Sequence, residues 1–121
     1  MMRMVFLSAV LVLCAVPALA YQSRCVVPYA PSVPDGRIAT KPQMNSAHTA
    51  VVGFIKQSDQ YQDCLLLEFK MEKQTAAHKQ KTFDTQIETD IKKMIAANQR
   101  EKERVGAEYN GAAHIYNELH P

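Results

Sequence analysis

The stretch TKPQMNSAHTAVVGFIKQSDQYQDCLLLEFKMEKQTAAHK, residues 40–79, decides the fold of this chain. Apolar side chains recur in it at the spacing of one α-helix face; they are Met44, Ala47, Val51, Phe54, Ile55, Tyr61, Leu65 and Phe69. Thr40 and Gln43 have the spacing of a capping box, and Pro42 suits the first turn. We therefore predict a helix that starts at Thr40 and is roughly 55–60 Å long, which other segments must cover.

The predicted helix is apolar on more than one flank. Cys64 is followed by three leucines at 65–67, and two valines stand together at 51–52. One partner helix covers only one stripe of such a helix. The remaining flank, which includes Val52 and Leu66, is therefore expected to contact the N-terminal arm, a partner protein or a second copy of the chain.

Helical periodicity returns after a polar interval. The apolar residues of this second segment again share one helix face; they are Phe83, Ile87, Ile91, Met94, Ile95, Val105, Tyr109, Ala112, Tyr116 and Leu119. Thr85 and Glu88 suggest another capping box. We predict a turn near 78–84 that joins two antiparallel helices, so that residues 40–121 form an all-α hairpin. No Gly or Pro marks this turn, and one continuous helix covered by other subunits is the alternative.

A hairpin that turns near residue 81 also predicts which residues face each other. Phe54 is expected to meet Tyr109, and Asp59 is expected to lie near Arg104. Apolar positions then face apolar positions almost throughout, which is the consistency expected of a true pairing.

The first 20 residues have the features of a signal peptide. Arg3 is followed by an apolar run at 5–16 and by Pro17, and the small-x-small residues 18–20 form a cleavage site. We therefore expect the mature protein to begin at Tyr21 and to be secreted into the periplasm.

Two other interpretations of this segment are weaker. An apolar run of this length is too short to span about 30 Å of hydrocarbon. A lipid anchor on Cys14 is disfavoured because Leu13, rather than a small residue, precedes it. Once Arg3 is removed, the 14 basic side chains become 13, against 12 acidic ones. This balance argues neither for nucleic acid nor for a membrane surface as a partner.

Two cysteines, Cys25 and Cys64, remain in the expected mature chain. In an oxidising compartment two thiols in a small secreted protein tend to pair. Two cysteines alone make a poor metal site, and no C-x-x-C spacing suggests redox catalysis. We predict one intramolecular disulfide.

The segment 21–39 is expected to form an extended arm. Its prolines at 28, 31 and 34 follow the period of a polyproline II helix, and Asp35-Gly36 suggests a turn in which Gly36 takes a positive φ. A polyproline path from Cys25 to Asp35 is roughly 31 Å long, and a helix from Thr40 to Cys64 roughly 36 Å. An arm that folds back along the helix therefore brings the two cysteines together. A flexible linker is the alternative.

These residues suggest a family. The pattern C-x-x-P-x-x-P-x-x-P-D-G-x-x-A-T at 25–40, followed by YQDCL at 61–65, resembles an uncharacterised group of small secreted proteobacterial proteins. The stretch from Tyr109 to Asn117 also looks like the C-terminal helix of that group. The resemblance implies a periplasmic helical hairpin, and it brings no activity, ligand or catalytic residue.

Enzyme signatures are missing from the sequence. It contains no G-x-S-x-G, no H-E-x-x-H, no phosphate-binding glycine loop and no EF-hand loop. We expect a non-catalytic protein without a cofactor, which acts by protein–protein interaction or in an envelope-structural role. Its partner is either another envelope protein or a second copy of the chain. Residues such as Val52 and Leu66 are expected to contact that partner.

Two sets of residues support alternative functions. Met44 and His48 share a helix face, and the hairpin register is expected to place His114 opposite His48; imidazole and thioether ligands suit copper. The predicted hairpin tip carries a basic cluster that could bind anionic envelope surfaces. Its members are Lys70, Lys73, Lys79 and Lys81.

Overall fold

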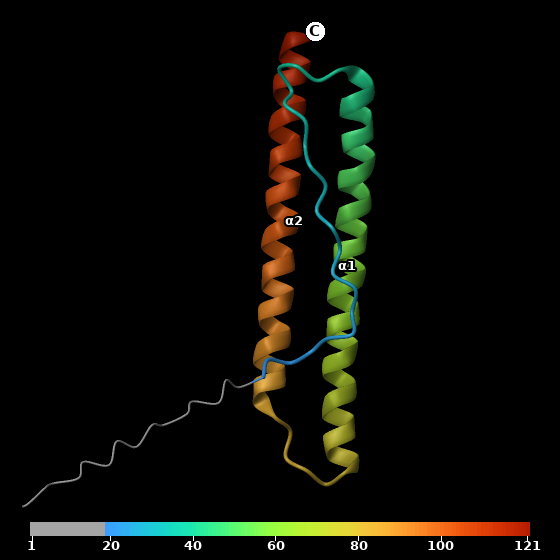
Figure 1. Ribbon diagram of the computed structural model, residues 1–121, viewed down its shortest axis with the longest axis vertical. Coiled ribbons are helices and arrows are strands. Elements are labelled where there is room, and N and C mark those ends of the chain that lie inside the picture. Colours follow the sequence, from blue (N-terminus) through green and yellow to red (C-terminus); the bar gives the residue numbers. More distant parts are fainter. Residues whose placement is uncertain (1–18) are drawn as a thin grey trace, which may run out of the picture.

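The computed structural model describes residues 19–121 and consists of two long helices, α1 (Lys41–His78) and α2 (Thr85–Leu119), with no strand in this range. Figure 1 shows them side by side and antiparallel, with the chain turning at one end. The predicted all-α hairpin is confirmed, and the continuous helix is wrong. The expected signal peptide falls almost wholly on residues 1–18, outside the described residues. None of the helices described is both long and apolar enough to cross a membrane.

The predicted start of α1 is confirmed. The Thr40 side chain accepts a hydrogen bond from the Gln43 backbone N–H, and the Gln43 side chain accepts one from the Thr40 N–H. The capping box expected at Thr85 is wrong. The N-cap of α2 is Asp84, whose carboxylate accepts from the Gln86 N–H at 2.9 Å. Asp84, one residue before Thr85, thus supplies the side-chain acceptor that the first turn of the helix needs.

The turn between the helices uses a residue that gave no turn signal. Gln80 lies in the left-handed region with φ 52°. Its N–H donates to the Ala77 carbonyl, and the Lys81 N–H donates to the Ala76 carbonyl at 2.9 Å. These are the two hydrogen bonds of a Schellman motif, which usually has glycine where this chain has Gln80.

The core consists of two apolar clusters along the hairpin. Val51, Phe54 and Val105 form one cluster on the side of the open end of the hairpin. Cys25, Tyr61, Leu65 and Ile91 form the other, nearer the turn. Polar side chains lie between them. The Asn98 side-chain amide donates to the buried Ser58 hydroxyl at 3.2 Å, and the Gln62 side-chain amide donates to the side-chain oxygen of Asn98 at 2.9 Å. A paired polar layer of this kind favours one helix register over others.

One predicted pairing across the hairpin is right and one is wrong. Tyr109 packs against the cluster that contains Phe54, as expected. Asp59 binds Lys102 at 2.6 Å, whereas Arg104 turns back to Glu101 and Glu108 on its own helix. Positions 102 and 104 lie about 200° apart around a helix, so one of them faces α1 only if the other does not.

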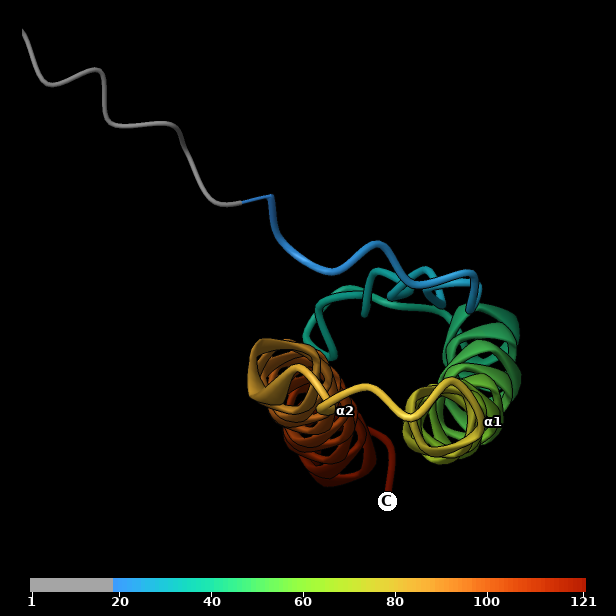
Figure 2. The ribbon, with the colours of Figure 1, turned by 90° about the horizontal axis from the view of Figure 1, so that it is seen from below.

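The arm docks on the hairpin, and the flexible-linker alternative is wrong. Figures 1 and 2 show the arm starting beside α2, crossing to α1 and then following one side of the hairpin to its open end. Cys25 and Cys64 form the predicted disulfide, with their Cα atoms 5.9 Å apart. The expected positive φ at Gly36 is wrong. Glycine is needed there because a Cβ atom would lie 2.0 Å from the Ala112 carbonyl oxygen of α2.

Candidate interaction surface

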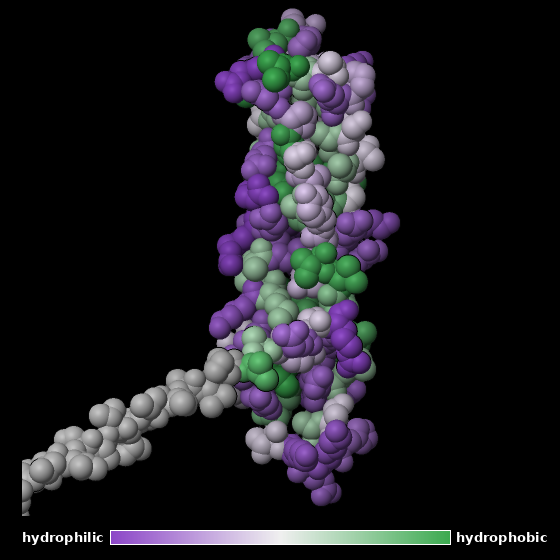
Figure 3. All heavy atoms as spheres, viewed as in Figure 1, coloured by the Kyte–Doolittle hydropathy of each residue, from purple (hydrophilic) through white to green (hydrophobic). Residues whose placement is uncertain are grey.

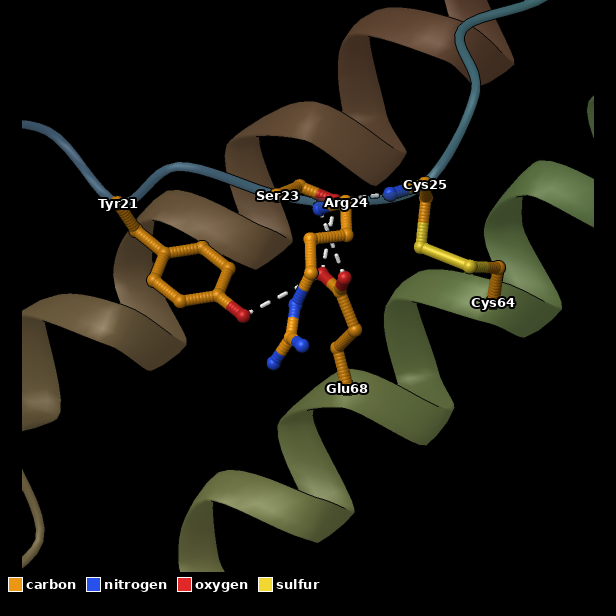
Figure 4. Close-up of a disulfide and its surroundings, with 6 residues drawn as sticks. All are labelled: Tyr21, Ser23, Arg24, Cys25, Cys64 and Glu68. Carbon is orange, nitrogen blue, oxygen red and sulfur yellow. Dashed lines mark hydrogen bonds between the residues drawn. A yellow bond between two sulfur atoms is a disulfide. The ribbon is translucent and has the colours of Figure 1, made fainter.

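The start of the arm is fastened to α1 by Glu68. Its carboxylate accepts hydrogen bonds from the Ser23 hydroxyl at 2.7 Å, the Arg24 backbone N–H at 2.8 Å and the Tyr21 hydroxyl at 3.3 Å. Figure 4 shows these groups converging one helical turn from Cys64. The disulfide and Glu68 together hold residues 21–25 against α1.

A second carboxylate fastens the same segment to α2. Asp90 accepts from the Tyr21 backbone N–H at 3.0 Å and from the Gln86 side-chain amide at 2.8 Å. These two hydrogen bonds, that from Tyr21 first, lower the pKa of Asp90 because they stabilise its charged form. Burial, followed by the nearby Glu68 charge, raises the pKa of the Tyr21 phenol. Sequence reasoning missed Glu68 and Asp90, because isolated acids on a helix carry no signal until the arm is docked.

Downstream of Cys25 the arm exposes apolar side chains. Val26, Val27 and Tyr29 are 86%, 68% and 89% exposed. A groove on the α1 side of this segment is lined by Gln57, Gln60 and Tyr61, and one on the α2 side by Met94, Ala97 and Glu101. Figure 3 shows hydrophobic residues gathered at mid-height on this face. The arm therefore covers the hairpin and presents new apolar surface outward.

The outer face of α1 carries a second exposed apolar area, which we call the outer α1 surface. It consists of Val52, Leu66, Leu67 and Met71, which are 52%, 54%, 57% and 53% exposed. Val52 and Leu66 each follow a buried residue by one position and so point about 100° away from the core-facing line. Leu67 points roughly 200° from Leu65, whose side chain is fully buried. All four remain more than half exposed although α2 and the arm are docked on α1.

The structure does not gather the residues proposed for copper. The Met44 side chain is buried in α1. His48 is exposed and its ring contacts that of Tyr109, with the centroids 5.6 Å apart. His114 is nine positions from the buried Val105, hence on the opposite side of α2, and binds Glu118 at 3.2 Å. The same count, applied to the sequence, would have separated His114 from His48.

Within residues 19–121, one group of three His, Cys, Asp or Glu side chains brings its ligand atoms within 4.8 Å of one another. It comprises Cys25, Cys64 and Glu68. Both sulfur atoms belong to the disulfide, and Glu68 already accepts three hydrogen bonds from the arm. The usual metal ligand is a thiolate and not a disulfide sulfur, so these three residues make a poor metal site. They hold the start of the arm against α1 instead.

The basic cluster lies at the hairpin tip, as predicted. Lys70, Lys73, Lys79 and Lys81 are all exposed. The Lys73 ammonium lies 5.3 Å from the centroid of the Phe69 ring. The tip also carries acids: Glu88 pairs with Lys92, and this ion pair, with a smaller contribution from Lys73, lowers the pKa of Glu88. Charges of both signs therefore share this end of the molecule.

Comparisons with known proteins do not assign the chain to a family. No family model matches it, and neither a curated protein nor a solved structure is significantly similar. The resemblance to a group of small secreted proteins thus stays a prediction.

Proposed function

We propose that this protein is a non-catalytic helical hairpin of the periplasm that acts through protein–protein contacts, the first of them with a second copy of itself. The outer α1 surface carries this proposal. Three of its members, Leu66, Leu67 and Met71, remain more than half exposed close together on α1, and clustered exposed apolar side chains mark interaction sites.

A second copy fits this surface better than a charged ligand does. Leu66, Leu67 and Met71 lie within about two turns of α1, and charged residues of both signs stand beside them in the chain: Glu68 follows Leu67, and Lys70 and Glu72 flank Met71. Glu68 is already bound by the arm, which leaves Lys70 and Glu72 beside Met71, and a second copy placed antiparallel would meet this pair with charges of the opposite sign. Two hairpins that pair in this way have the architecture of a four-helix bundle, which buries more surface per residue than a hairpin can.

The periplasmic location rests on two independent features. The N-terminal sequence has the organisation of a signal peptide, and a disulfide such as Cys25–Cys64 forms and persists in oxidising compartments. Osmotic-shock fractionation of bacteria that express the full chain tests the location. Release of oxidised protein with the periplasmic fraction is expected, whereas reduced protein retained in the cytosol would contradict the proposal.

Light scattering of the purified mature chain tests self-association. We expect the mass of a dimer at micromolar concentration. The double variant Leu66→Glu, Leu67→Glu should give the mass of one chain, because two charges would have to be buried in the interface. Asn110→Glu is the matched control, since it adds a charge to an exposed position of α2 outside the surface, and it should remain dimeric.

The outcome distinguishes an interface from a folding defect. Circular dichroism should show the same helix content in the wild type and in both variants, because the substituted side chains lie outside the core. A wild-type mass of one chain up to the highest attainable concentration would refute self-association. An equal loss of mass in the Asn110→Glu control would refute the assignment to the outer α1 surface.

A further inference from the structure

Asp90 is an almost buried carboxylate whose hydrogen-bond donors are neutral. The side chain lies on α2, and the residue is 9% exposed. Its two oxygens accept from the Gln86 amide and the Tyr21 backbone N–H. In the part of the chain that the structure describes, no Lys, Arg or His nitrogen forms an ion pair with it. Withdrawing a carboxylate from water is costly unless a cation compensates it, so this site favours one additional positive charge.

The backbone nitrogen that reaches Asp90 is the one that signal-peptide cleavage would free. Leu19 is 94% exposed and Ala20 is exposed, and both lie in chain without helix or strand. The peptide bond before Tyr21 is therefore accessible. In its hydrolysis by a signal peptidase, water supplies a hydroxyl to the Ala20 carbonyl carbon and a proton to the Tyr21 nitrogen. The released amine binds a further proton near neutral pH and becomes an ammonium.

We propose that Asp90 is the binding site of the mature N-terminus: the α-ammonium of Tyr21, once released, forms an ion pair with the Asp90 carboxylate and locks the start of the arm onto α2. The inference rests on the proposed cleavage after Ala20. Cleavage replaces a neutral N–H donor with a charged group that has up to three N–H donors, in a place where the chain already positions the nitrogen 3.0 Å from the carboxylate oxygen.

Charged groups of both signs surround Tyr21 and Asp90. From α1, Glu68 and Glu72 act on the Tyr21 phenol, and Arg24 of the arm opposes them. On α2, Lys93 acts on Asp90 from beyond ion-pairing distance. The Asp90 carboxylate lies within hydrogen-bond distance of the Tyr21 nitrogen and favours the protonated amine, so the pKa of the amine should be raised above the usual value of about 7.7–8.0. A raised pKa in the folded state stabilises the fold fully below that usual value, and the contribution is lost as the pH rises through the raised pKa.

Three purified forms of the protein, which differ only at the N-terminus, test the proposal. The first starts at Tyr21 with a free amine, the second is acetylated at that amine, and the third starts at Leu19. Acetylation removes the charge but keeps one N–H donor, whereas the third form moves the charge by two residues. Each form is also made with Asp90→Asn, which keeps the size of the side chain. The readouts are the α-amine pKa, from NMR titration, and the urea unfolding constant.

We expect the free amine to titrate roughly one unit above its usual range, and to return to that range in Asp90→Asn. Acetylation and the two-residue extension should each raise the unfolding constant about 3- to 10-fold in the wild type, and less than about 2-fold in Asp90→Asn. An α-amine pKa near 8 in the wild type, or equal effects of acetylation with and without Asp90, would overturn the proposal. The comparison of free and acetylated wild type decides the matter even if Asp90→Asn folds poorly.

N-terminal sequencing of the exported protein tests cleavage after Ala20 separately from the ion pair. A sequence that begins with Tyr21 is the expected result. Another first residue would overturn the use of this site in the cell by refuting cleavage after Ala20, while the three purified forms still report on the ion pair itself. Self-association through the outer α1 surface is measured separately and does not enter either readout.

Discussion

Substitution of Gly36 by alanine should release from α2 the part of the arm around Gly36, just before α1 begins. A Cβ atom at this position would lie 2.0 Å from the Ala112 carbonyl oxygen and 3.1 Å from the Tyr116 backbone nitrogen. Both neighbours are backbone atoms of a helix, which cannot rotate away. The arm must therefore retreat by at least about 1 Å, since carbon–oxygen contacts below about 3 Å are repulsive.

That displacement is resisted on both sides of Gly36. The Asp35 carbonyl accepts hydrogen bonds from the Ile38 and Ala39 N–H groups, and Thr40 is already fixed as the N-cap of α1. Overpacking of this kind costs about 1–3 kcal/mol. Loss of glycine freedom in the unfolded chain offsets about 0.4–1 kcal/mol of it. A net destabilisation of roughly 1–2 kcal/mol should lower the melting temperature by about 5–15 °C in a domain of this size.

Thermal unfolding followed by circular dichroism, with hydrogen exchange of residues 26–39, is the appropriate assay. Gly111→Ala is the matched control. Gly111 is exposed in α2, and a Cβ atom there would meet nothing within 4 Å. This variant should be more stable by about 0.5–1 kcal/mol, since alanine favours the helix. A Gly36→Ala protein as stable as the wild type, with unchanged exchange in the arm, would refute the reasoning.

The other predictions concern the disulfide, the turn and an acid. Cys25→Ser with Cys64→Ser should destabilise the fold by about 4 kcal/mol, the chain-entropy value for a loop of this length, measured by urea unfolding of the oxidised wild type and the variant. Gln80→Gly should stabilise it by about 0.5–1 kcal/mol, because glycine adopts a positive φ without strain; a lower melting temperature would contradict the Schellman geometry. The pKa of Asp90 is lowered on folding, so its contribution to stability is present above the unfolded value, 3.8, and is lost as the pH falls through the folded value. The urea midpoint should therefore fall more steeply below about pH 4 in the wild type than in Asp90→Asn, and parallel curves would count against the hydrogen bonds of Asp90.

The sequence by itself determined the features that depend on residues close together in the chain. Thr40 and Gln43 are three positions apart, so their reciprocal capping follows from helix geometry alone. Cys25 and Cys64 were paired because they are the two cysteines of the expected mature chain, and the lengths of the arm and of α1, which follow from the rise per residue, agreed with that pairing. The apolar periodicity likewise identified the buried face of each helix, including Leu65.

Only the tertiary structure decided the features that depend on how separate segments approach. Gly36 is required by the closeness of α2 and not by its own φ angle, and the roles of Glu68 and Asp90 depend on where the arm begins. The turn at Gln80 carried no signal, because the packed helices hold a non-glycine residue at a positive φ that its local preference disfavours. Contacts of this kind are set by register and rotation between helices, to which local hydrogen bonding and periodicity are insensitive.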